Sequence, residues 1–428
     1  MRFRVADFLL VSYMYVILFG LWVFGRIIND DAAVYTLLNV VEVIPLVCFV
    51  IHLLLKRKAL SPGSCGEVFV TSKKFWGIIL AFLFLVFASA YINKGNILSS
   101  ISHVVVLTRF IPFAYFVVLN RSSDAILRHI RIISFILPVI GIIEIILGPG
   151  CYPWFTPAAQ AHSAIRYDNS IFGIYPNTVD YAYMLLAFFA LQYSSVSNSI
   201  PRKLFLLALY SVLIYYTGSK AALLVLALVF LLAVPRKPVF KVSVLIMGIL
   251  TASYFIYDNY ELFYWTVFEN SMYSRGGLLL VTLPEFLKEL DLNTFIGVTS
   301  DYQLAFDKIS SLPNPLLWIQ EVDHMTSFED CFYVALIVYY GVIGFGILVY
   351  LLWRVYRFFI KQEYMNVDYD YKFVVRSLFL CLLVLPLFGQ ILVIRTFSFV
   401  FWALMAVVYS NLCNSNEKSF PDIKHVAK

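Results

Sequence analysis

About twelve apolar runs, most of them close to twenty residues long, are the feature that most constrains how this chain folds. A helix needs about twenty apolar residues to cross a bilayer, whereas a barrel strand needs about ten residues of alternating polarity. The composition agrees, because 61% of the 428 residues are hydrophobic and 14% are charged, against about 25% charged in soluble domains. We therefore expect an all-α polytopic membrane protein with about 12 transmembrane helices, at roughly residues 8–25, 34–55, 75–92, 97–119, 132–148, 177–193, 204–217, 221–235, 238–257, 331–353, 374–392 and 396–413.

The distribution of Lys and Arg predicts which side of the membrane each loop occupies. With the N-terminus inside, 23 of the 32 Lys and Arg fall in segments assigned to the cytoplasm, and 7 fall in segments assigned to the opposite side. This bias follows the positive-inside rule and predicts that both termini are cytoplasmic. No small-residue cleavage site follows the first apolar run, so we expect a retained helix there rather than a signal peptide. The net charge of +6 needs no nucleic acid to explain it.

Two external connections are too long to be simple turns, and such connections usually carry function or are disordered. The second contains amphipathic pieces such as Gly277–Leu290, so we expect it to be partly helical and to lie over the membrane surface. The predicted organisation is N-terminal membrane helices, a first external loop, central membrane helices, a large external loop, and C-terminal membrane helices with a cytoplasmic tail, at residues 1–148, 149–176, 177–257, 258–330 and 331–428.

Three external cations are candidates for binding an anion. The large loop is acidic, with 12 Asp and Glu against 3 Lys and Arg, so an anion would be held there by specific cations rather than by the average field. Arg166 precedes a span, Arg275 lies in Ser-Arg-Gly-Gly-Leu-Leu, and Lys220 separates two spans in Thr-Gly-Ser-Lys-Ala. Arginine binds phosphate in a bidentate manner. Each arginine is equally compatible with pairing to a nearby carboxylate, and Lys220 with reaching the lipid headgroups.

Two further arginines lie within or at the edge of apolar runs. Arg109 is near the middle of the run at 97–119, where a charge is costly and often functional. Pairing with Glu42 or Glu144 inside the membrane is an alternative explanation. Arg395 begins the last run and is compatible with either a binding site or an ion pair.

Candidate proton acceptors cluster in Asp-His-Met-Thr-Ser-Phe-Glu-Asp-Cys-Phe-Tyr, just before a long apolar run. His324, Glu329 and Asp330 are all able to accept a proton from a sugar hydroxyl. A solvated helix N-terminus, where acidic residues favour the positive end of the dipole, explains the same pattern.

Taken in order, these elements resemble the superfamily of bacterial O-antigen polymerases and O-antigen ligases. The resemblance covers mainly residues 160–350, from Arg166 and the following Phe-Gly-Ile-Tyr-Pro-Asn to Gly-Val-Ile-Gly at Gly341. The ligases carry an arginine followed four residues later by leucine, as Arg275 and Leu279 do. They also carry a histidine eleven residues before Gly-x-x-Gly, where this chain has Asp330, and often an arginine in place of Lys220. The missing histidine favours the polymerase.

The resemblance implies transfer of a growing glycan from undecaprenyl pyrophosphate to another lipid-linked repeat unit, at the periplasmic face of the bacterial inner membrane. It also implies membrane lipids and a chain-length regulator protein as partners, and no cofactor. Arg166 and Arg275 would hold the donor pyrophosphate with help from Lys220, and these cations would take the part that a metal ion plays elsewhere. Glu329 or Asp330 would orient or deprotonate the acceptor hydroxyl, and His324 is the third candidate for this role.

Two other functions fit the same pattern. Twelve spans suit a flippase for the lipid-linked sugar equally well, although no internal repeat of the kind common in transporters is evident. A ligase that moves the finished glycan to another acceptor is the third possibility.

Overall fold

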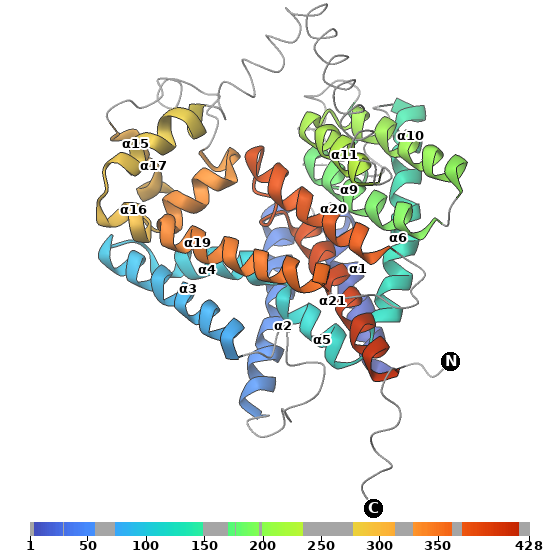
Figure 1. Ribbon diagram of the computed structural model, residues 1–428, viewed down its shortest axis with the longest axis horizontal. Coiled ribbons are helices and arrows are strands. Elements are labelled where there is room, and N and C mark those ends of the chain that lie inside the picture. Colours follow the sequence, from blue (N-terminus) through green and yellow to red (C-terminus); the bar gives the residue numbers. More distant parts are fainter. Residues whose placement is uncertain are drawn as a thin grey trace, which may run out of the picture.

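The structure is a computed structural model, and it describes residues 4–28, 30–55, 73–148, 170–175, 177–196, 199–233, 277–312, 328–361 and 370–418. Every regular element within these residues is helical (Figure 1). This agrees with the predicted all-α class.

The first half of the described chain forms nine helices. They are α1 (Val5–Ile27), α2 (Asp31–Leu55), α3 (Lys73–Ile92), α4 (Ile97–Thr108), α5 (Ile111–Leu119), α6 (Ser123–Leu147), α9 (Thr178–Ser195), α10 (Ile200–Tyr216) and α11 (Lys220–Ala233). The remaining elements are η4 (Leu278–Thr282), α15 (Leu283–Lys288), α16 (Leu292–Ile296), α17 (Tyr302–Ser310), η5 (Phe328–Asp330), α19 (Phe332–Lys361), α20 (Tyr371–Val384), η6 (Leu385–Leu387) and α21 (Arg395–Lys418).

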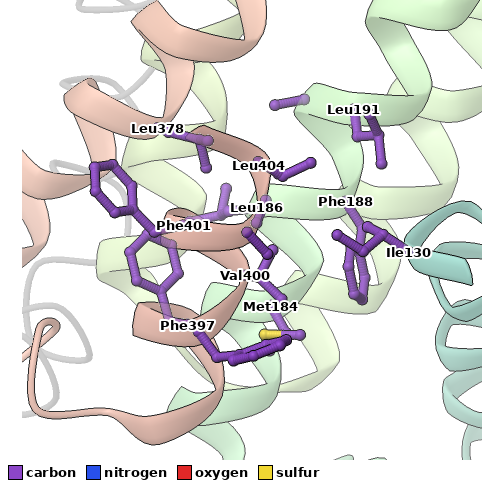
Figure 2. Packing of buried hydrophobic residues seen from close by; sticks show 14 of the residues in the cluster. Ile130, Met184, Leu186, Phe188, Leu191, Leu378, Phe397, Val400, Phe401 and Leu404 are labelled. Carbon is purple, nitrogen blue, oxygen red and sulfur yellow. The ribbon is translucent and has the colours of Figure 1, made fainter. Parts of the chain in front are cut away.

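Two helices form the main core, where residues 181–192 of α9 and residues 396–410 of α21 are all buried. These two stretches are predominantly apolar on every side, as expected for helices that face other helices in every direction. Figure 2 shows α9 side chains such as Met184 and Phe188 between α21, α20 and α6. Both residues are fully buried, as is Phe397 of α21.

Peripheral helices instead expose large apolar side chains along one face. On α2, one such face consists of residues that recur every three or four positions, Val40, Ile44, Val47, Ile51 and Leu54, and each is between 49% and 63% exposed. A continuous apolar stripe of this length does not face water in a stable protein. Its natural solvent is the lipid chain region, so the helices indicate a membrane-embedded protein.

The number of spans is supported only in part. Among the described residues, four helices are long and apolar enough to cross a membrane, namely α1, α2, α6 and α19, and α4 with α5 is a fifth if the bent pair is one span. The bend between α4 and α5 is 42°. Helices cover eleven of the twelve predicted runs, and the run at 238–257 lies outside the described residues. The hairpin predicted at residues 204–217 and 221–235 is present in its described part as α10 and α11, which turn at Gly218 with a φ of +72°.

A second core lies where η4, α15, α16 and α17 pack onto α3, α4 and the first part of α19. We call residues 277–312 the docked unit. Its apolar side chains Leu278, Phe286 and Ile309 are at most 1% exposed. The predicted helical segment at Gly277–Leu290 is therefore present as η4 and α15, and it is packed against the membrane helices.

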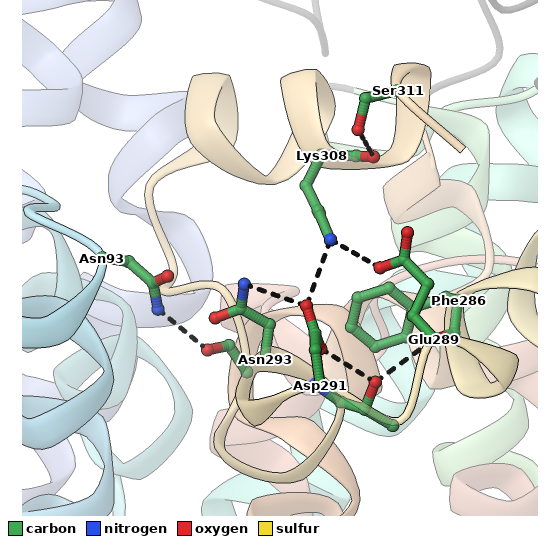
Figure 3. Close-up of polar contacts among 9 residues, drawn as sticks. Asn93, Phe286, Glu289, Asp291, Asn293, Lys308 and Ser311 are labelled. Atoms are coloured by element: carbon green, nitrogen blue, oxygen red, sulfur yellow. Dashed lines mark hydrogen bonds and ion pairs between the residues drawn. The ribbon is translucent and has the colours of Figure 1, made fainter. Parts of the chain in front are cut away.

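An ion-pair network connects α17 to the segment between α15 and α16 within the docked unit (Figure 3). Lys308 on α17 lies 2.5 Å from a carboxylate oxygen of Glu289 and 3.2 Å from one of Asp291. Burial acts to raise the pKa of Asp291, but the Thr294 N–H, the Lys308 ammonium and the Thr294 hydroxyl outweigh it, so this pKa lies below its usual value. The partly exposed ion pairs each contribute little to stability. Their role is to fix α17 over the turn that begins α16.

Candidate functional site

The site is centred on a break in α19. Gly341 has a φ of +66° inside this otherwise continuous helix. The break removes helical hydrogen bonds from the preceding carbonyls, which need other donors when buried. The N–H groups of Val298 and Thr299 supply them, at 2.8 Å from the Val338 oxygen and 3.3 Å from the Tyr339 oxygen. A segment of the docked unit thus completes the hydrogen bonding of the broken helix.

Two glycines allow this close approach of backbones. A Cβ atom on Gly297 would overlap the backbone of Tyr339 and Tyr340, and one on Gly341 would overlap the backbone of Phe295. Both glycines also have positive φ. Any other residue at either position would force the two segments apart.

The loop at residues 297–300, which we call the junction loop, is both strained and polar. Thr299 has a φ of +115°, a costly conformation for a β-branched residue. Side chains of α3 and α4 hold the loop in place: the Ser89 hydroxyl donates to the Gly297 carbonyl at 2.7 Å, and the Ser100 and Thr299 hydroxyl oxygens are 2.8 Å apart. Strain of this kind is retained where the surrounding structure enforces it, and it is common at functional sites.

Four polar and aromatic side chains surround the break. The Tyr339 hydroxyl donates a hydrogen bond to Glu329 Oε1, and the Tyr340 hydroxyl is hydrogen-bonded to His103 Nδ1. The His103 ring also lies edge-on to the Tyr339 ring, with centroids 5.1 Å apart. We call Glu329, Tyr339, Tyr340 and His103 the glutamate site. It joins η5, the part of α19 that precedes the break, and α4, so it exists only in the folded chain.

Arg109 belongs to a separate buried ion-pair cluster. Its Nη1 lies 2.5 Å from Glu42 Oε2, and its Nη2 donates to the Val393 carbonyl at 2.7 Å. Arg395 Nε pairs with the other oxygen of Glu42, and its Nη2 donates to Asn39 at 2.9 Å. Of the alternatives, pairing with Glu42 is correct for Arg109, and the ion pair is correct for Arg395. Glu144 instead accepts the N–H groups of Phe172 and Gly173, at 3.1 and 2.7 Å.

This cluster forms where helices are interrupted. Arg109 lies between α4 and α5. Val393 lies in the irregular segment before α21, and Arg395 is the first residue of α21. Guanidinium groups at helix breaks satisfy carbonyls that a continuous helix would have satisfied itself. The cluster therefore ties α2, the α4–α5 bend and the start of α21 together.

The predicted site residues are only partly placed by the structure. Arg166, Arg275 and His324 lie outside the described residues, and of Asp330 only its position in the η5 turn is described. Glu329 is partly exposed at the glutamate site, whereas Lys220 is exposed at the start of α11. In Figure 1, α11 lies on the opposite side of the molecule from the docked unit. The structure does not bring Glu329 and Lys220 together.

Residue patterns had not pointed to His103, Tyr339 or Tyr340. The available signals were weak: His103 is a polar residue inside the apolar run at 97–119, and the two tyrosines directly precede Gly341. Only the pairing of the docked unit with α19 shows that they meet.

Within the described part of the chain, no three His, Cys, Asp or Glu side chains gather in a way that could hold a metal ion. No family model matches the sequence, and no curated protein matches it either.

Proposed function

We propose that this protein is a membrane-embedded polysaccharide polymerase of the O-antigen polymerase type. It transfers a glycan from undecaprenyl pyrophosphate to a second lipid-linked repeat unit at the periplasmic face of the inner membrane. The observation that carries the proposal is the glutamate site: a partly exposed carboxylate, held by the Tyr339 hydroxyl beside a strained loop. The sequence resemblance supplies the substrate class.

In this reaction Glu329 acts as the general base. Its carboxylate takes the proton of the acceptor hydroxyl while that oxygen attacks the anomeric carbon of the donor sugar. The bond between the anomeric carbon and the pyrophosphate oxygen breaks, and its electron pair leaves with undecaprenyl pyrophosphate. The Tyr339 hydroxyl fixes the orientation of the carboxylate, which favours a single productive geometry.

Of the predicted cations, Arg275, two residues before the docked unit in the chain, is the proposed partner of the leaving pyrophosphate. Lys220 is left out of this step because α11 lies across the molecule from the docked unit (Figure 1), and one contact indicates that the chain after Arg166 lies near Lys220. The Ile171 N–H, five residues after Arg166, donates to the carbonyl of Tyr216, four residues before Lys220, at 3.0 Å. The chain that follows Arg166 therefore runs beside the α10–α11 turn.

The test is polymerisation in a defined system. The purified protein in lipid nanodiscs is given lipid-linked repeat unit, which is extracted from a strain that lacks this protein. The products are then separated by size. Wild-type protein should produce a ladder of polymers, and Glu329→Gln should slow its formation by about 10²-fold or more, because a general base is lost. Glu285→Gln is the matched control, since Glu285 lies in the docked unit and pairs with exposed Lys288. Failure of the wild-type protein to extend the repeat unit would exclude the polymerase.

A flippase is the second candidate, and the broken helices favour it. Transporters commonly bind substrate where membrane helices are discontinuous, and here α4 with α5 and α19 are both interrupted. Deletion of the protein distinguishes the two. A polymerase deletion leaves surface polysaccharide with a single repeat unit, whereas a flippase deletion leaves no surface sugar.

A further inference from the structure

Three nearly parallel aromatic rings form a row beside Glu329. Tyr302 of α17 packs nearly parallel to Phe306 of the same helix and to Phe328 of η5, with centroid distances of 6.0 and 5.3 Å and interplanar angles of 17° and 18°. Phe328 in turn packs edge-on against Tyr339, at 5.5 Å. The row thus ends at the tyrosine whose hydroxyl holds the Glu329 carboxylate.

The members of this row differ in exposure. Phe328 is 3% exposed and makes a rigid inner support, whereas Tyr302 is 42% exposed. Tyr302 is therefore a large aromatic ring held in a fixed orientation at the surface, next to a carboxylate that is also partly exposed.

A sugar ring matches this combination of groups. The C–H groups on one face of a pyranose carry partial positive charge and lie favourably against the electron-rich part of an aromatic ring. The hydroxyl groups at the edge of the same sugar donate hydrogen bonds to a carboxylate. Binding sites for small polar molecules typically combine an aromatic wall with a few well-placed polar groups.

We infer that Tyr302, supported by Phe328 and Phe306, forms the subsite for the acceptor sugar, with the reacting hydroxyl directed to Glu329. The assignment to the acceptor, rather than the donor, rests on the proposed function, because there Glu329 removes the proton of the acceptor hydroxyl. Tyr302 is a binding residue in this scheme, and it takes no proton itself.

Direct binding tests this subsite without depending on catalysis. The probe is the repeat-unit oligosaccharide released from its lipid by mild acid, and saturation-transfer NMR reports which of its sugars contacts the purified protein. We expect transfer to the terminal non-reducing sugar with wild-type protein. Tyr302→Ala and Tyr302→Leu should weaken binding about tenfold, since each removes one aromatic contact. Tyr302→Phe keeps the ring and should bind as wild type does.

Tyr91→Ala is the matched control, because Tyr91 is 81% exposed at the end of α3 and should not affect binding. In the polymerisation assay with the soluble oligosaccharide added as the acceptor, Tyr302→Ala should raise the KM for this oligosaccharide about tenfold and leave kcat nearly unchanged. The subsite is wrong if wild-type protein does not bind the oligosaccharide, or if Tyr302→Ala or Tyr302→Leu binds it normally. Binding by a wild-type protein that makes no polymer would instead refute the polymerase and leave a sugar site at Tyr302.

Discussion

At the scale of single residues, the costliest feature is the buried cluster of Glu42 with Arg109 and Arg395. The side chains of Arg109 and Glu42 are 6% and 4% exposed. One carboxylate here pairs with two guanidinium groups, and Asp180 on α9 is the further acidic group whose charge interacts with Arg395. Removing one partner of a buried pair is far more damaging than replacing the whole pair with apolar groups, because the remaining charge has no partner.

Glu42→Gln should therefore destabilise the protein strongly. The substitution keeps the side-chain volume but leaves two arginines without their shared carboxylate, so we expect a loss of about 3 kcal/mol in the free energy of unfolding. Thermal unfolding in detergent, followed by tryptophan fluorescence, measures the effect. The double variant Glu42→Leu with Arg109→Met should be less destabilised than Glu42→Gln. Equal unfolding temperatures for Glu42→Gln and the wild type would show that the cluster contributes nothing.

At the scale of elements, the break in α19 is the point at which one helix accepts a segment of another unit. Of the three glycines in this helix, Gly341 has a positive φ and close neighbours, whereas Gly346 has neither. An added Cβ would meet the backbone of Phe295 at Gly341, whereas nothing lies within 4 Å of the corresponding position at Gly346. This pair separates the effect of the junction from that of glycine as such.

Gly341→Ala should displace the docked unit, since its φ of +66° and the nearby backbone both exclude a side chain. Hydrogen exchange of residues 277–312 should increase, and polymerisation should fall with it. Gly346→Ala should leave exchange unchanged and stabilise the helix by up to about 1 kcal/mol. Normal exchange in Gly341→Ala would mean that the junction tolerates a side chain and that the contact is not close in solution.

At the scale of the whole molecule, the charge bias predicts opposite sides of the membrane for two exposed positions. Arg202 lies in the first turn of α10 among the basic residues assigned to the cytoplasm, and Lys288 ends α15 in the docked unit. In a variant without native cysteines, a membrane-impermeant maleimide added to intact cells should label Lys288→Cys and not Arg202→Cys. Both should be labelled after the membrane is permeabilised. Labelling of Arg202→Cys alone in intact cells would show that the protein has the opposite orientation in the membrane.

Local patterns in the sequence were sufficient to predict the helical membrane class of the protein and the approximate positions of most described helices. Runs of apolar residues at 8–25 and 34–55 became α1 and α2, and the Gly-Ser-Lys turn became a hairpin, because hydrophobicity and turn chemistry act locally. The pairing of Arg109 was also within reach, since so few buried carboxylates were available to neutralise it.

The contacts between residues that are distant in the sequence become evident only in the tertiary structure. A sequence does not show that the α19 helix breaks at Gly341, that Val298 satisfies the carbonyl of Val338, or that His103 reaches the tyrosines beside Glu329. His103 and Tyr340 are 237 residues apart, and the break in α19 depends on a backbone conformation that no local pattern encodes. They exist because buried backbone groups freed by a break must find partners wherever the fold supplies them.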